Sequence, residues 1–106
     1  MSIMLLGAGG QLGRELALSL PALGQVWSPS RAQVDLSTPL AASDAIRRIR
    51  PQCVVNAAAY TNVDRAESEP ELAHRINSDA VGEIARACAA CDSHLIHFST
   101  DYVFAG

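Results

Sequence analysis

Residues 3–13 read Ile-Met-Leu-Leu-Gly-Ala-Gly-Gly-Gln-Leu-Gly, and this stretch decides the fold. A short apolar run leads into glycines at positions 7, 10 and 13, and a helical pattern follows. Gly7 and Gly10 suit a tight turn in which bare backbone N–H groups meet an anion at the positive end of a helix. Gly13 is expected to let that helix lie close to its own sheet, because a Cβ there would push the two apart. The pattern predicts a strand, a turn and a helix that together bind the phosphates of a dinucleotide.

Glycine spacing alone is weak evidence, since glycine-rich turns also occur in unrelated βα units. The spacing here is GxxGxxG rather than GxGxxG. The strand pattern before the glycines and the helix pattern after them favour the nucleotide-binding interpretation.

The chain has 106 residues, of which 49% are hydrophobic and 18% are charged, a composition typical of one soluble domain. The formal net charge is -3 and the basic residues are scattered, so no basic field for nucleic acid is expected. The first apolar run is too short for a signal peptide or a membrane span. These features predict a cytoplasmic protein without nucleic-acid or membrane partners.

Three cysteines, an odd number, argue against a disulfide framework. Cys88 and Cys91 form a C-x-x-C pair, but no second pair or suitably spaced histidines accompany it. His94 and His97 are three apart in a strand pattern, so they point to opposite faces and cannot share one metal. No metal site is therefore predicted.

Short β-like runs alternate with longer helical stretches, the pattern of βαβ units around a parallel sheet. Strands are expected near residues 2–6, 25–28, 34–36, 53–56 and 94–99. With right-handed crossovers their order would be 3-2-1-4-5, an α/β fold of the Rossmann type with a doubly wound parallel sheet, truncated after the fifth strand. The cofactor then belongs at the C-terminal ends of the first and fourth strands.

Three helices are expected between these strands. The first begins after Gly10, ends near Pro21 and has a buried stripe formed by Leu12, Leu16 and Leu20. The second begins at Thr38-Pro39 and is stopped by Pro51. The third covers roughly residues 69–90, with apolar residues every four positions at Leu72, Ile76, Ala80, Ile84 and Cys88.

The segment after the second strand lacks the acid that a NAD site usually offers to the ribose. It reads Ser28-Pro29-Ser30-Arg31, so Arg31 could pair with a 2′-phosphate and Ser30 could donate to it. This favours NADPH, with NADH as the alternative. The other interpretation is a surface loop whose arginine lies in water.

Three further strand ends carry candidate site residues, each with a plainer interpretation. Asp35 and Leu36 could contact adenine, or Asp35 could be a turn residue. The small residues at 57–59, with Tyr60 and Thr61, could admit ribose and nicotinamide or simply pack the strand end. Thr100 could direct a hydroxyl at a reacting carbonyl, or could be a strand-end cap.

Four blocks occur in order: GAGGQLG at 7–13, VDL at 34–36, NAAAYTNVDRAESEPELAHRIN at 56–77 and STDYVFAG at 99–106. Together they resemble the extended short-chain dehydrogenases/reductases, and within them the dTDP-4-dehydrorhamnose reductase family. The resemblance covers essentially the whole chain, which would be the N-terminal part, residues 1–106, of an NAD(P)-binding Rossmann domain.

The resemblance implies a role for residues of each block. Pyrophosphate contacts fall on Gly7, Gly10, Gln11 and Leu12; adenine contacts fall on Asp35 and Leu36; ribose and nicotinamide contacts fall on Ala59, Tyr60 and Thr61, with Phe98 nearby. Thr100 takes the place of the catalytic Ser/Thr, and the sugar substrate would contact Thr100, Asp101 and Val63.

The implied reaction reduces the 4-keto group of dTDP-4-dehydro-L-rhamnose with NADPH or NADH, in the synthesis of nucleotide sugars for lipopolysaccharide. Its tyrosine acid normally stands in a Tyr-x-x-x-Lys motif, but neither Tyr60 nor Tyr102 begins one and the chain has no lysine. We therefore expect these 106 residues to be inactive alone, with the motif and a substrate lobe beyond Gly106. Some family members form magnesium-dependent homodimers, but no acidic residues for that site are identified here.

A second function remains open from the residues. A non-catalytic NADP-binding regulatory subunit, similar to the beta subunit of methionine adenosyltransferase, shares the same sequence pattern. An intact Tyr-x-x-x-Lys downstream would favour the enzyme, and its loss would favour the regulator.

Overall fold

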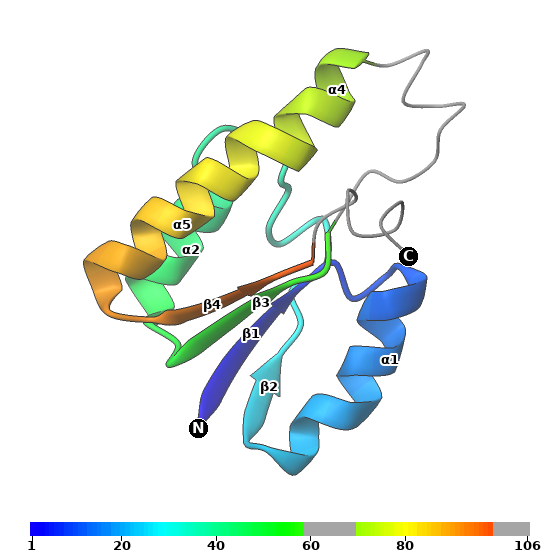
Figure 1. Ribbon diagram of the computed structural model, residues 1–106, viewed down its shortest axis with the longest axis vertical. Helices are drawn as coiled ribbons and strands as arrows, with labels where there is room; N and C mark the ends of the chain where they lie inside the picture. The colour runs from blue at the N-terminus through cyan, green and yellow to red at the C-terminus, as the bar shows by residue number, and fades with distance from the viewer. Residues whose placement is uncertain (59–69, 99–106) are drawn as a thin grey trace.

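The computed structural model describes residues 1–58 and 70–98. In this part of the chain a parallel sheet has helices on both faces (Figure 1). The strands are β1 (Ser2–Leu6), β2 (Gln25–Trp27), β3 (Cys53–Asn56) and β4 (His94–His97), in the order β2-β1-β3-β4. The Rossmann-type α/β fold predicted from the sequence is confirmed.

The core explains why β1 is apolar along its whole length. Alternate side chains of a strand point to opposite faces, and both faces of this strand are covered. Ile3 and Leu5 belong to one buried cluster, whereas Met4 and Leu6 belong to another. Residues 3–6 are each at most 3% exposed, which makes β1 the centre of the molecule.

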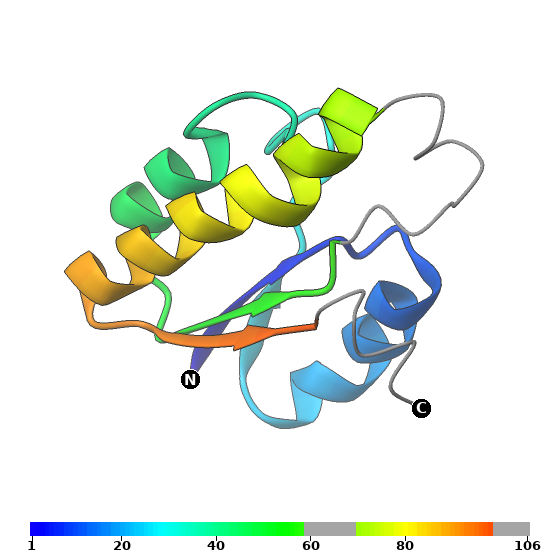
Figure 2. The same ribbon diagram turned by 45° about the horizontal axis from the view of Figure 1, so that its top comes forward.

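The helices divide between the two faces of the sheet. Helix α1 (Gln11–Ser19), followed by the 3-10 turn η1 (Leu20–Ala22), lies on one face, and α2 (Ala41–Ile49) lies on the other beside α5 (Ala80–Cys91) (Figures 1 and 2). Because all the strand pairs are parallel, each crossover takes the chain from the carboxyl end of one strand back to the amino end of the next, and the carboxyl ends of all four strands lie together.

The third predicted helix is continuous but not uniform. It starts as α4 (Pro70–His74), widens into the π turn η2 (Arg75–Asp79) and continues as α5 (Figure 1). The N–H of Ala80 donates to the carbonyl of Arg75 five residues earlier, which is the π pattern. The predicted apolar stripe is buried in α5, and the described helices include none long and apolar enough to cross a bilayer.

The predicted strand at 34–36 is wrong. Ser30 and Gln33 exchange hydrogen bonds in a turn, with the Ser30 N–H 2.8 Å from Gln33 Oε1 and the Gln33 N–H 3.3 Å from Ser30 Oγ. Asp35 then forms a second turn with Ser37. These side-chain bonds fold the segment locally and leave it no extended stretch to pair with β2, although Val34 is still buried in the core.

Two helix details also differ from the prediction. Leu12 is 39% exposed rather than buried, because Gly13 is the residue of the first turn of α1 that faces the sheet. Helix α2 begins at Ala41 rather than at Thr38-Pro39, because Leu40 adopts a left-handed conformation (φ 65°) at its N-cap. Its predicted end before Pro51 is confirmed, with Arg50 as the left-handed C-cap.

Candidate nucleotide-binding site

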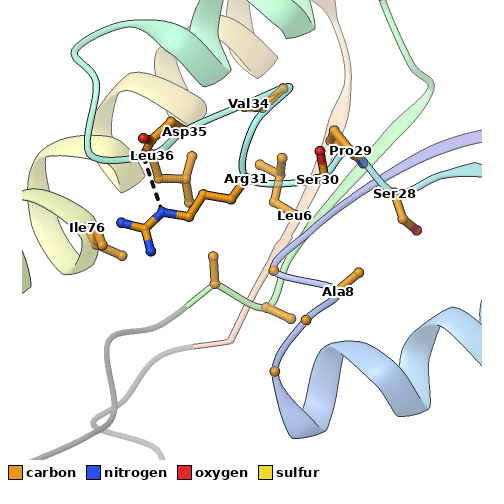
Figure 3. A pocket seen from close by; sticks show the side chains of 15 residues that line it. Leu6, Ala8, Ser28, Pro29, Ser30, Arg31, Val34, Asp35, Leu36 and Ile76 are labelled. Carbon is orange, nitrogen blue, oxygen red and sulfur yellow. Dashed lines mark ion pairs between the residues drawn. The ribbon is translucent and has the colours of Figure 1, made fainter.

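A cavity of about 590 Å³ opens at the carboxyl ends of β1, β2 and β3 (Figure 3). Its size lies within the range of about 300–1,000 Å³ that is typical of small-molecule sites. It is lined by residues 6–10, 28–31, 34–36 and 57–58, and by Ile76. This is the position predicted for the cofactor, at the strand ends where an open parallel sheet binds ligands.

Two glycines, Gly7 in the loop after β1 and Gly13 in the first turn of α1, are required by packing within the protein. Gly7 has a φ of +84°, and a Cβ there would lie 2.6 Å from the carbonyl carbon of Ala57. At Gly13 a Cβ would overlap the Gly7 carbonyl and lie 2.8 Å from Ala8 Cα. The predicted roles of Gly7 in the turn and of Gly13 in close helix packing are confirmed.

Gly9 and Gly10 line the cavity without any such constraint. A Cβ on Gly9 would have no protein atom within 4 Å, and one on Gly10 would meet only the Gly7 carbonyl oxygen at 3.7 Å. Gly10 has an ordinary extended conformation (φ -81°, ψ 173°) and is the N-cap of α1. The protein fold therefore does not require glycine at these two positions, and their missing side chains expose backbone to the cavity at a helix N-terminus.

Arg31 brings positive charge to the wall opposite the glycine loop. Its side chain is 78% exposed and lines the cavity (Figure 3). Its Nε lies 3.9 Å from Asp35 Oδ1, a loose and solvated ion pair that holds the guanidinium only weakly. Ser30 Oγ accepts a hydrogen bond from the Gln33 N–H, so its own hydroxyl hydrogen remains a donor. Both side chains are therefore suited to an anionic group.

Asp35 is a turn residue, one of the two interpretations that the sequence left open, and it also lines the cavity. Its Oδ1 accepts hydrogen bonds from the Ser37 hydroxyl at 2.6 Å and the Ser37 N–H at 2.9 Å, which makes Asp35 a turn residue. The same residue lines the cavity beside Leu36. The hydrogen bonds from Ser37 hold the pKa of the Asp35 carboxyl below its ordinary value. An ionised carboxylate only accepts hydrogen bonds, so it would match a donor such as an exocyclic amine.

The end of β3 is organised by Asn56, whose role the sequence did not reveal. Asn56 is 1% exposed; its Oδ1 accepts the Ala58 N–H at 3.0 Å, and its Nδ2 lies 3.2 Å from His97 Nδ1 on β4. These bonds fix the backbone of Ala57 and Ala58 where both line the cavity. The sequence signal that could have pointed to this role is an asparagine directly after the apolar run at residues 53–55.

Three predicted contacts do not line the cavity. Gln11 and Leu12 open α1 next to the loop, so their contribution to anion binding would come from backbone N–H groups. Phe98 packs against the cluster of Ile3, Leu5 and their neighbours instead. The remaining predicted residues lie outside the described part of the chain: Ala59, Tyr60, Thr61, Val63, Thr100 and Asp101.

Cysteine chemistry is not suggested by the geometry. Burial raises the pKa of the Cys88 thiol to about 11, which keeps it protonated near neutral pH. Within residues 1–58 and 70–98, no three His, Cys, Asp or Glu side chains gather into a metal-binding group.

Comparison with known proteins identifies the family. The profile of the family described as "RmlD substrate binding domain" matches residues 1–106. The chain belongs to this family. It is 46% identical over 106 residues to a dTDP-4-dehydrorhamnose reductase of Burkholderia thailandensis and 48% identical over 105 residues to one of Mycolicibacterium smegmatis. These alignments cover 100% and 96% of this chain, but only 36% and 31% of the two relatives.

Solved structures of RmlD-family relatives have the same fold. A dTDP-4-dehydrorhamnose reductase of Bacillus anthracis, in complex with NADP, superposes with a TM-score of 0.79 at 30% identity. The superposition covers 89% of this chain and 34% of the Bacillus anthracis chain. A Sulfolobus tokodaii structure described as a hypothetical reductase of this kind gives a TM-score of 0.82 at 36% identity, over 92% of this chain and 38% of its own. The chain thus spans about a third of the length of the relatives it matches, and the resemblance predicted from its motifs is confirmed.

Proposed function

We propose that residues 1–106 bind NADPH for a reductase that converts dTDP-4-dehydro-L-rhamnose to dTDP-L-rhamnose. The observation that carries the proposal is the bare backbone at Gly9 and Gly10, which no packing contact requires and which faces the cavity at the start of α1. A diphosphate fits this feature, because backbone N–H groups and the helix dipole both favour an anion there. The similar reductases, one of them in complex with NADP, support the same assignment.

NADPH is favoured over NADH by the wall that carries Ser30 and Arg31. Among its lining residues 28–31 and 34–36, the one acid is Asp35, which already receives two hydrogen bonds from Ser37. The Arg31 guanidinium is held only loosely, so it can turn toward a 2′-phosphate. Asp35 and Leu36 would then hold the adenine.

The bound nicotinamide would supply the hydride that reduces the 4-keto carbon of the sugar. The residues of this chain would bind and orient the reactants: Ala59, Tyr60 and Thr61 would contact ribose and nicotinamide. Thr100 would orient the ketone by a hydrogen bond, and Asp101 with Val63 would contact the sugar. These six assignments follow from the family motifs.

The rest of the active site would come from the part of the relatives that this chain does not span. That part would supply the Tyr-x-x-x-Lys acid and a substrate lobe, and the whole protein would act in the cytoplasm. The proposal also includes that the whole protein forms a homodimer and that this dimer binds magnesium.

Two measurements on the full-length protein test this function. Titration with NADPH and NADH, followed by cofactor fluorescence, should show binding of NADPH and a preference for it. Incubation with dTDP-4-dehydro-L-rhamnose should then oxidise NADPH and yield dTDP-L-rhamnose. Binding of NADPH without turnover would contradict the reductase and favour a regulatory subunit, and absence of nucleotide binding would contradict both.

A further inference from the structure

The helix formed by α4, η2 and α5, here called the long helix, carries an ion pair that is hydrogen-bonded to the turn at 34–40 beside the cavity. Arg75 and Glu83 contact each other through two hydrogen bonds, Nη1 to Oε2 at 2.7 Å and Nη2 to Oε1 at 2.6 Å. Their side chains are only 14% and 11% exposed. Arg75 Nη2 also donates to the Thr38 carbonyl at 3.1 Å, and Glu83 Oε1 accepts the Leu40 N–H at 2.9 Å. We call these four residues the clasp.

The π turn brings the two charged residues to the same side of the helix. Residues eight apart in a regular α-helix point about 80° apart, because each residue turns about 100°. The turn η2 takes up one extra residue, so the effective spacing becomes seven residues, about two full turns. Arg75 and Glu83 therefore share a face and can meet in a bidentate pair.

The clasp reaches the cavity from both sides. Thr38, which Arg75 holds, donates its N–H to the Asp35 carbonyl at 3.0 Å, so the clasp continues by hydrogen bonds into a lining residue. On the helix, Ile76 follows Arg75 directly and lines the same end of the cavity as Leu36 (Figure 3). The clasp thus connects the two segments that line this end of the cavity, the turn that carries Asp35 and the helix that carries Ile76.

The energetics of the clasp favour a positioning role over a stabilising one. Burying two charges costs about as much as their attraction returns, so such pairs add little net stability. Arg75 Nε is buried without a hydrogen-bond partner in the described residues, a further cost. Leu40 is held in a left-handed conformation that an L-residue adopts reluctantly. What the clasp does supply is a fixed distance and orientation between the helix and the turn.

We propose that Arg75 and Glu83 are positioning residues for the adenine end of the bound cofactor, acting by holding the turn at 35–38 against the helix that carries Ile76. The proposal rests on the proposed NADPH site and adds to it two residues that do not line the cavity. If the clasp is lost, the turn samples other positions, and apparent affinity falls with the fraction of binding-competent molecules.

The test separates the two ends of the cofactor in the full-length protein. The double variant R75M/E83L removes both charges together, so no lone charge is left buried. We expect its affinity for 2′,5′-ADP to fall about tenfold, as for a turn that is correctly placed a tenth of the time. Its affinity for reduced nicotinamide mononucleotide should be unchanged, because that fragment does not reach the turn. Arg48→Met, an exposed arginine in α2, is the matched control and should alter neither affinity.

Glu83→Gln gives a second perturbation that keeps the size of the side chain and an oxygen for the Leu40 N–H, but leaves the Arg75 charge without its carboxylate. It should weaken 2′,5′-ADP binding in the same direction as the double variant, and it decides the matter if the double variant fails to fold. Unchanged affinity for 2′,5′-ADP would overturn the proposal, and so would an equal loss for both fragments, which is the mark of a merely structural pair. If the wild type binds neither fragment, the proposed NADPH site itself fails instead.

Discussion

Replacing Gly10 by alanine should separate ligand binding from stability. Its backbone conformation suits any residue, and the new Cβ would only touch the Gly7 carbonyl oxygen at 3.7 Å. Alanine is a poorer N-cap than glycine by up to about 1 kcal/mol. It also restricts the unfolded chain, which returns about 0.4–1 kcal/mol. We therefore expect the free energy of unfolding to change by less than about 1 kcal/mol.

The effect of Gly10→Ala on affinity should be much larger. A methyl group at the mouth of the cavity would keep a phosphate from its closest approach to the backbone N–H groups. Losing one charge-assisted hydrogen bond costs about 1.5–3 kcal/mol. Since about 1.4 kcal/mol corresponds to a factor of ten, NADPH affinity should fall about ten- to 150-fold.

Two other glycines serve as controls for this experiment. Gly13→Ala should reduce stability by about 1–3 kcal/mol through overpacking, because the obstructing atoms are the backbone of Gly7 and Ala8. Gly82→Ala, in α5, meets only the flexible end of Arg86 and should not alter affinity. Stability is measured by denaturant unfolding and affinity by NADPH fluorescence. Undiminished affinity in Gly10→Ala would refute the phosphate site at this loop.

Three further outcomes are expected. Arg31→Ala should weaken NADPH binding about ten- to 150-fold through loss of about 1.5–3 kcal/mol and leave NADH binding unchanged; equal losses for both cofactors in titrations would contradict the 2′-phosphate contact. Hydrogen bonds from Arg75 hold the pKa of Glu83 below its ordinary 4.5, so the stability of the ionised pair is complete above that pH and is lost as the pH falls through the lowered pKa. Glu83→Gln should therefore flatten the acid side of the stability profile below about pH 5, measured by thermal unfolding, and an unaltered profile would exclude this contribution. Asn56→Ala should lower the free energy of unfolding by about 1–3 kcal/mol, because the Ala58 N–H loses its acceptor. Denaturant unfolding measures this change, and a smaller loss would contradict the role given to Asn56.

The parts of the structure that the sequence predicted correctly depend on local patterns. Local sequence was enough to predict three features: the strand at residues 2–6, the glycine turn that follows it, and the helix α5 with its apolar repeat. The order of the four observed strands was also predicted, since right-handed crossovers leave few alternatives, although the strand expected at 34–36 is absent from the sheet. For the same reason, the position of the cavity at the strand ends could be predicted without any side-chain contact.

The segment at 34–36 was mistaken for a strand because its apolar positions fit one. Val34 is buried and Leu36 is half-buried, as in a strand, but a side-chain hydrogen bond of Ser30 forms a turn before Val34 and one of Asp35 forms a turn at residues 35–37. Such bonds compete with sheet formation and leave no periodic signal. The error did not move the predicted site. Asp35 lies near the carboxyl ends of the strands whether its segment is a turn or a strand end.

The two walls of the cavity differ in how the sequence specifies them. The wall proposed for the diphosphate consists of backbone, so the absence of side chains at Gly9 and Gly10 is visible in the sequence itself. The wall proposed for adenine contains the turn that hydrogen-bonds to Arg75 and Glu83, whose spacing of eight residues matches no regular helical pair and becomes favourable only through the π turn. Motifs can therefore locate the diphosphate, whereas the geometry that holds the base depends on contacts between segments more than thirty residues apart. A substitution in the long helix should consequently alter cofactor affinity without touching any motif, which makes that helix the place to look for variants with changed binding.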